Sequence, residues 1–231
     1  MSNQFRLPLA ATPTYAREDF AVSPGNSDAV ARLDAWPDWS EGRLALVGPA
    51  GSGKTHLARA WAARADAVII DATGPAAAAP DLPALRGKAI LVDDADRRGE
   101  GQALSDEALF HILNMAGVDG GTVLLTGRVA PLAWETSVAD LRSRLNALSV
   151  AAIEEPDDVV LEAVLRRAFA QRLLKPDPDL YPYLVSRLPR SAAEAIAAAD
   201  LLDEEAAERR RELNKALARD VLGDFEGEEE L

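Results

Sequence analysis

A glycine-rich loop between two apolar segments constrains the fold of this chain more than any other feature. Residues 48–55 read GPAGSGKT, which matches the phosphate-loop pattern G-x-x-x-x-G-K-[ST] in full. An apolar run at 43–47 precedes the loop, and apolar residues at helical spacing follow it. A strand, a glycine loop and a helix in this order are typical of a parallel α/β sheet whose loop binds phosphate.

The segments on either side of the loop extend this pattern. We expect further strands at 67–71, 89–96, 122–127 and about 147–153, and helices at 28–36 and 105–117. The 105–117 helix begins at a capping serine, Ser105, and ends at a glycine. Strands that alternate with helices predict a P-loop α/β core, a three-layer parallel sheet over residues 23–156.

The pattern changes after Pro156. Four helical segments follow without a strand signal, at 157–174, about 180–188, 191–211 and 214–222. We therefore expect a small all-helical lid domain over 157–222. Residues 1–22 show no sustained period and predict an extended, mobile N-terminal arm, and 223–231 predict a solvated acidic tail.

Charge and cysteine content exclude several classes of function. The formal net charge of -13 argues against a protein that coats nucleic acid by itself, because phosphate binding needs clustered cations. The absence of cysteine excludes disulfides and zinc–thiolate sites, and two histidines make an all-histidine metal site implausible. No apolar run approaches the roughly 18 residues of a membrane span, and the N-terminus lacks a cationic signal head. We expect a cytoplasmic protein without membrane association.

The phosphate loop and the end of a later strand supply the predicted nucleotide site. Backbone N–H groups of the loop surround phosphate oxygens, Lys54 neutralises the β- and γ-phosphates, and Thr55 holds Mg²⁺. Asp93 ends the apolar strand AILVD and is expected at the Mg²⁺ shell, with Asp94 facing the attacking water. The loop residues assigned to the nucleotide are Gly48, Pro49, Ala50, Gly51, Ser52, Gly53, Lys54 and Thr55.

Taken together, these motifs resemble the AAA+ module of the bacterial initiator DnaA. The resemblance runs from about residue 19 to 222 and includes TVLLTG before Arg128 and the segment LRSR that ends at Arg144. The sequence ends at 231, where DnaA would continue into a helix-turn-helix domain, so we expect no DNA-binding domain. The chain is therefore similar to the Hda family of regulators, which switch DnaA off.

The resemblance implies roles for three further residues. Arg144 matches the arginine finger that DnaA-like proteins project toward a neighbour's γ-phosphate. Arg190 matches the sensor 2 arginine, which contacts nucleotide from the helical domain, and Asn26 lies in a segment implied to flank the adenine. A different interpretation of Arg144 or Arg190 is a surface arginine paired with a nearby carboxylate, and Arg142 fits that role better than Arg144.

The N-terminal arm carries a short motif that resembles the sliding-clamp-binding peptide of the Hda family. Its residues are Gln4, Phe5, Leu7, Pro8 and Leu9. Pro8 biases Leu7 toward an extended conformation, and the segment offers one amide and several apolar side chains to a groove. The other interpretation of this motif is an apolar arm that folds back on its own domain.

Several positions depart from the DnaA pattern. Arg128 falls where DnaA commonly has the sensor 1 aspartate, Asp94 replaces the glutamate of many ATPases, and Arg190 lacks the usual following glutamate. We therefore expect the chain to bind ADP or ATP with Mg²⁺ and to hydrolyse it weakly. His56 and His111 receive no role, and the four tryptophans are expected to serve packing.

Three functions fit these observations. The first is a nucleotide-bound regulator that docks on the DNA polymerase III β sliding clamp and supplies Arg144 to ATP on DnaA, repressing replication initiation. It permits a homodimer without requiring one. The second is an ATP-dependent helicase loader similar to the DnaC type, and the third is a small-molecule P-loop kinase. The acidic charge and Asp94 speak against the second, and the third leaves LRSR and the N-terminal motif unexplained.

Overall fold

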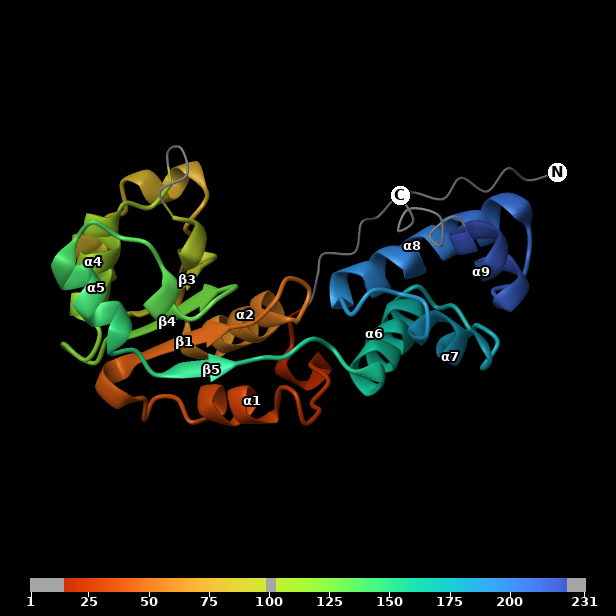
Figure 1. The fold of residues 1–231 in the computed structure, drawn as a ribbon, viewed down its shortest axis with the longest axis horizontal. Helices are drawn as coiled ribbons and strands as arrows, with labels where there is room; N and C mark the ends of the chain where they lie inside the picture. Colours follow the sequence, from red (N-terminus) through yellow and green to blue (C-terminus); the bar gives the residue numbers. More distant parts are fainter. Residues whose placement is uncertain (1–14, 99–102, 224–231) are drawn as a thin grey trace.

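The computed structural model describes residues 15–98 and 103–223, and its centre is a five-stranded parallel sheet (Figure 1). The strand order is β2-β3-β4-β1-β5. The strands are β1 (Arg43–Val47), β2 (Val68–Asp71), β3 (Ala89–Asp93), β4 (Thr122–Gly127) and β5 (Val150–Ala152). The parallel sheet predicted from the sequence is confirmed, with shorter third and fifth strands than expected. Strand β3 stops at Asp93 because Asp94 adopts a left-handed conformation (φ 53°).

Alternate strand residues point to opposite faces of the sheet, and each face is covered by its own helices. Ile90 and Val92 pack in one apolar cluster with helices α3 (Leu82–Leu85), α4 (Asp106–Met115) and α5 (Ala139–Asn146). Leu91, which lies between them, packs in a second cluster with α1 (Ser27–Asp34) and α2 (Lys54–Ala65). The three-layer arrangement follows directly from this period of two.

Helix starts and tryptophans behave as the sequence predicts. The Ser105 side chain accepts a hydrogen bond from the Ala108 N–H at the start of α4. The Trp39 and Trp61 rings stack with centroids 5.1 Å apart, and both residues are buried in the α1–α2 cluster. The α/β part also contains the short 3-10 helices η1 (Arg17–Asp19), η2 (Ser40–Gly42), η3 (Pro75–Ala78), η4 (Ala95–Arg97) and η5 (Pro131–Ala133).

The C-terminal part is helical and has its own apolar cluster. It contains α6 (Asp158–Gln171), α7 (Leu180–Val185), α8 (Ala192–Arg209) and α9 (Lys215–Leu222), which enclose the fully buried Phe169. Figure 1 shows these helices as a separate group reached through the segment after β5. Among the described residues, no helix is both long and apolar enough to cross a bilayer.

A hydrogen bond and an ion pair are among the contacts that join the helical part to the core. The Ala192 N–H donates to the Gly51 carbonyl at 2.8 Å, so the start of α8 touches the phosphate loop. Arg167 of α6 forms an ion pair with Asp19. Residues 15–22, which we expected in a mobile arm, pack instead on the start of α2, where the His56 ring nitrogen lies 2.9 Å from the Ala16 carbonyl oxygen.

Candidate nucleotide-binding site

The phosphate loop lies at the carboxyl edge of the sheet, between β1 and α2. Gly51 (φ 73°) and Gly53 (φ 94°) occupy the left-handed region that favours glycine. A Cβ at Gly51 would lie 2.1 Å from the Ser191 Oγ, and a Cβ at Gly53 would lie 2.9 Å from a ring carbon of Phe20. Both glycines are therefore required by close approach as well as by backbone conformation.

Lys54 and Ser52 are two buried polar side chains of the loop that suit a phosphate ligand. The Lys54 ammonium donates to the Gly48 and Pro49 carbonyls, both at 2.7 Å, and Lys54 is buried. Burial lowers the pKa of Lys54, while the charges of nearby aspartates, Asp94 foremost, oppose that shift. The Ser52 hydroxyl is buried and has no hydrogen-bond partner among the described residues. An unsatisfied donor beside a buried ammonium fits the oxygens of a nucleotide phosphate.

The carboxylates at the end of β3 face the loop. The Thr126 hydroxyl donates to the Asp93 Oδ1 at 2.6 Å and accepts from the Asp94 N–H at 2.8 Å. Burial raises the pKa of Asp94, and the neighbouring charges of Asp93 and Asp96 add to the rise. With Thr55 exposed at the start of α2, the hydroxyl and carboxylate oxygens provide a donor set that suits Mg²⁺.

Sequence reasoning missed Thr126 and Arg59, and both contact Asp93. The Arg59 Nη2 lies 3.9 Å from the Asp93 Oδ2. The signal for Arg59 was its position four residues after Thr55, which puts both side chains on one face of α2. The signal for Thr126 was a lone hydroxyl in the apolar strand next to β3.

The structure engages the predicted residues Arg190 and Asn26 in contacts within the chain. Arg190 forms an ion pair with Asp158, and the next residue, Ser191, lies against Gly51. The Asn26 side-chain oxygen accepts from the Ser23 N–H at 2.9 Å, and its amide nitrogen donates to the Ala21 carbonyl at 3.0 Å. The predicted contacts of these two residues with a nucleotide stay predictions.

Arg128 brings positive charge toward the phosphate loop. Its backbone N–H donates to the Asp96 Oδ2 at 2.8 Å, and the residue is exposed. The Arg128 charge opposes protonation of Lys54 and so contributes to the lowered pKa of that lysine, although burial is the main cause. The β4 side chain that contacts Asp93 is Thr126, which lies two residues before Arg128, the residue at the sensor 1 position.

Arg144 lies at the opposite edge of the sheet from the loop. It is exposed in the last turn of α5, and its charge adds to burial in lowering the pKa of Arg43, the first residue of β1. The loop begins after the last residue of β1, so the strand separates the two features by about 16 Å at 3.3 Å per residue. Within 15–98 and 103–223, Arg144 has no side-chain hydrogen bond or ion pair.

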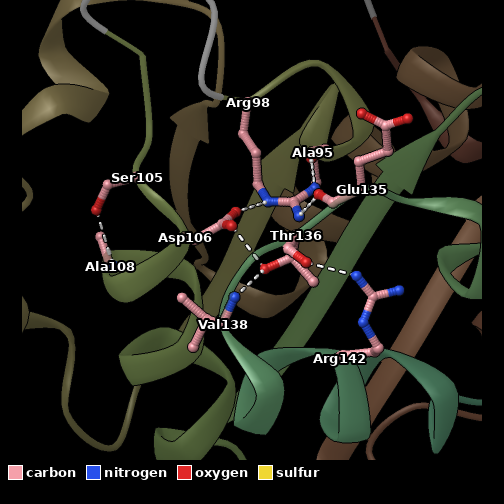
Figure 2. Close-up of polar contacts among 9 residues, drawn as sticks. All are labelled: Ala95, Arg98, Ser105, Asp106, Ala108, Glu135, Thr136, Val138 and Arg142. Atoms are coloured by element: carbon pink, nitrogen blue, oxygen red, sulfur yellow. Dashed lines mark hydrogen bonds and ion pairs between the residues drawn. The ribbon is translucent and has the colours of Figure 1, made fainter.

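Figure 2 shows how α5 is attached to the core through a polar network. The Arg98 Nε donates to one oxygen of Asp106 at 2.8 Å, and the Thr136 hydroxyl donates to the other at 2.6 Å. The Thr136 carbonyl accepts from the Arg142 guanidinium. The first arginine of LRSR thus anchors the helix, and Arg144 is left facing solvent.

The parallel sheet and the phosphate loop define a P-loop α/β domain, and comparisons with known proteins show which proteins it resembles. No protein-family model matches the chain. The chain is 30% identical over 173 residues to the chromosomal replication initiator protein DnaA of Caulobacter sp. strain K31, which covers 66% of this chain and 36% of that protein. It is 28% identical over 220 residues to DnaA of Caulobacter vibrioides, covering 84% and 45%. The chain thus spans less than half the length of these relatives.

Solved structures agree with this comparison at the level of fold. Domain III of the Thermotoga maritima replication initiation protein DnaA superposes with a TM-score of 0.76 at 20% identity and covers 93% of this chain and 98% of that one. A replication initiator DnaA bound to AMPPCP and single-stranded DNA gives a TM-score of 0.68 at 19% identity, with 86% and 69% covered. The chain therefore has the AAA+ P-loop fold of DnaA domain III.

The clamp-binding motif predicted at residues 4–9 lies outside the described residues. The other predicted residues fall into two groups. The loop, Asp93 and Asp94 meet at the carboxyl edge of the sheet. Arg190 precedes Ser191, which lies against Gly51 of the loop, and Asn26 bonds to Ser23 and Ala21. Arg144 stands apart at the amino edge, and the chain does not bring it to its own loop.

Proposed function

We propose that this chain is a nucleotide-bound regulator similar to the Hda family, which uses Arg144 to stimulate hydrolysis of ATP held by DnaA. Three features of Arg144 carry the proposal: it is exposed, it lies far from its own loop, and its side chain has no hydrogen bond or ion pair with the residues that the structure describes. A guanidinium that cannot reach its own loop is suited to a site on another molecule. The positive charge of the neighbouring Arg43 repels the Arg144 guanidinium, which favours an outward orientation.

The proposed chemistry of Arg144 is electrostatic. A guanidinium placed at the γ-phosphate stabilises the charge that spreads over its oxygens in the transition state, an effect of about 10³–10⁵ in rate. The rate gain depends on position, because a misplaced charge stabilises substrate and transition state alike. Attachment of α5 through Arg142 and Thr136 supplies that positioning.

The chain's own loop is proposed to bind ADP or ATP as a structural ligand, with Thr55 and Asp93 holding Mg²⁺ when the ion is bound. The related fold solved with AMPPCP supports an adenine nucleotide. The start of α8 contacts Gly51, so a phosphate in the loop would also adjoin the helical part. Asp94 is one methylene shorter than glutamate and reaches less far toward an attacking water, so we propose weak hydrolysis at this loop.

Docking on the DNA polymerase III β sliding clamp is proposed for residues 4–9. The support is the sequence motif, with Gln4 as the polar anchor and Phe5, Leu7 and Leu9 as apolar ones. Clamp binding would concentrate the regulator where replication has begun, and repression of further initiation by DnaA would follow.

The deciding experiment measures hydrolysis of ATP on DnaA in the presence of DNA-loaded clamp. Arg144→Ala is expected to remove stimulation, and Arg144→Lys is expected not to restore it, because lysine lacks the planar fork of donors. Arg86→Ala is the matched control, because Arg86 is an exposed arginine whose only described partner is Asp119 on the surface. Full stimulation by Arg144→Ala would exclude this mechanism.

A second measurement tests the clamp. A pull-down with purified clamp should lose the protein when residues 1–9 are deleted and retain it when Arg144 is changed. If the clamp still retains the chain that lacks residues 1–9, the proposal that residues 4–9 bind the clamp is wrong. A protein that shows strong ATP turnover with single-stranded DNA and no clamp binding would be a helicase loader instead.

A further inference from the structure

Arg59 on α2 faces Asp93, the carboxylate that is proposed to serve Mg²⁺. Thr55 and Arg59 are four residues apart on α2 and therefore share one face of the helix. Long side chains on a helix lean toward its N-terminus, so the Arg59 side chain extends back toward the phosphate loop. Its Nη2 accordingly lies 3.9 Å from the Asp93 Oδ2.

The Arg59 guanidinium is held among carboxylates at the carboxyl edge of the sheet. Asp71 and Asp93 are paired in the register of β2 and β3, and the Arg59 charge acts on both. Hydrogen bonds from Thr73 are the main cause of the lowered pKa of Asp71, and the Arg59 charge adds to it. The Arg59 Nε is buried and has no hydrogen-bond partner in the described part of the chain.

This geometry differs from that of a structural ion pair. The contact of 3.9 Å is too long for a hydrogen bond, and the other oxygen of Asp93 already accepts from Thr126. Asp93 is buried, whereas the Arg59 side chain is about one-third exposed at 35%. The Arg59 charge is thus directed at the one carboxylate that is proposed to serve Mg²⁺, without being locked there.

We propose that Arg59 is the resident counter-ion of Asp93 and makes nucleotide binding at this loop nearly independent of Mg²⁺. The inference rests on the proposed binding of ADP or ATP. A divalent ion between Thr55 and Asp93 would stand close to the guanidinium on the same face of α2, and like charges in a partly buried site repel strongly. Arg59 instead neutralises the charge of Asp93, which would otherwise repel the phosphates, and Lys54 supplies positive charge to them without a metal.

The test uses the full chain and a fluorescent ADP analogue, with affinity measured in EDTA and in excess Mg²⁺. The wild-type affinity is expected to change by less than about threefold between the two conditions. Arg59→Gln is expected to bind more weakly in EDTA and to gain about tenfold or more on adding Mg²⁺. Arg59→Lys keeps the charge and is expected to behave as the wild type does.

Arg64→Gln is the matched control, because it removes one positive charge from the same helix. Arg64 lies near the other end of α2 and donates to the Trp36 carbonyl, away from the loop. It is expected to leave the Mg²⁺ dependence unchanged, and a change as large as that of Arg59→Gln would make the effect one of net charge and overturn the proposal.

The outcomes separate this inference from the proposed function. If no variant, wild type included, binds the analogue, the proposed nucleotide site fails and the inference fails with it. If all bind and Mg²⁺ raises affinity equally in wild type and Arg59→Gln, only the role of Arg59 is wrong. Should Arg59→Gln fail to fold, the wild type decides, because a gain of about tenfold with Mg²⁺ would overturn the proposal.

Discussion

The hydroxyl of Thr126 provides the sharpest test of how the carboxylates at the end of β3 are held. Thr126→Val keeps the shape of the side chain and removes two hydrogen bonds, one donated to Asp93 at 2.6 Å and one accepted from the Asp94 N–H at 2.8 Å. A bond to a charged group contributes about 1.5–3 kcal/mol, and an N–H left without its acceptor costs about 1 kcal/mol. We therefore expect a loss of about 2–4 kcal/mol in the free energy of unfolding.

Urea denaturation followed by circular dichroism measures this loss, and thermal unfolding should show a fall of about 2–4 °C per kcal/mol for a chain of this size. The control is Thr122→Val on the same strand, where the hydroxyl accepts a single neutral bond from the Trp36 ring N–H at 3.1 Å. Its cost should be about 0.5–1.5 kcal/mol.

A double-mutant cycle isolates the charge of Asp93. In an Asp93→Asn background the acceptor is neutral, so the cost of Thr126→Val should fall by roughly 1 kcal/mol or more. A cost that is unchanged in that background, or one no larger than the cost of Thr122→Val, would refute the argument that a charge-assisted bond holds Asp93.

Three further predictions follow from the packing and charges of the core. Gly51→Ala should lower the free energy of unfolding by about 1–3 kcal/mol and weaken nucleotide binding, because the new Cβ must displace Ser191 and the alanine must adopt a left-handed backbone conformation. Denaturation measures the first effect and nucleotide titration the second. Asp94→Asn should raise the denaturation midpoint at pH 7. Burial raises the pKa of Asp94, so ionisation of this carboxyl destabilises the fold as pH rises above the ordinary value of 3.8. Equal gains in the midpoint at pH 7 and below pH 3.8 would contradict this. Trp61→Ala should cost about 3–5 kcal/mol by removing a buried ring that stacks on Trp39, which urea denaturation would measure.

The elements that could be predicted from the sequence are those whose signal is local. The phosphate loop is a contiguous motif between an apolar run and a helix, and the Ser105 cap lies next to the helix that it begins. The apolar run AILVD likewise marked β3 up to Asp93, although the expected strand continued to residue 96. In each case the residues that create the structure are neighbours in the chain.

The contacts that could not be predicted depend on which elements become neighbours in space. Thr126 meets Asp93 because β4 pairs with β3, a register that no local pattern specifies. Arg144 approaches Arg43 because the end of α5 packs near the start of β1. The ion pair between Arg190 and Asp158 depends in the same way on how α6 lies beside the start of α8.

The placement of Arg144 and the phosphate loop at opposite ends of β1 gives the molecule a polarity. A contact that joins the arginine end of one molecule to the loop end of another is head-to-tail, and it uses two different surfaces. After one such contact, an unused arginine remains at one end of the pair and an unused loop at the other. Association through this contact is therefore directional, and only a ring or a partner that lacks one of the two ends would stop it.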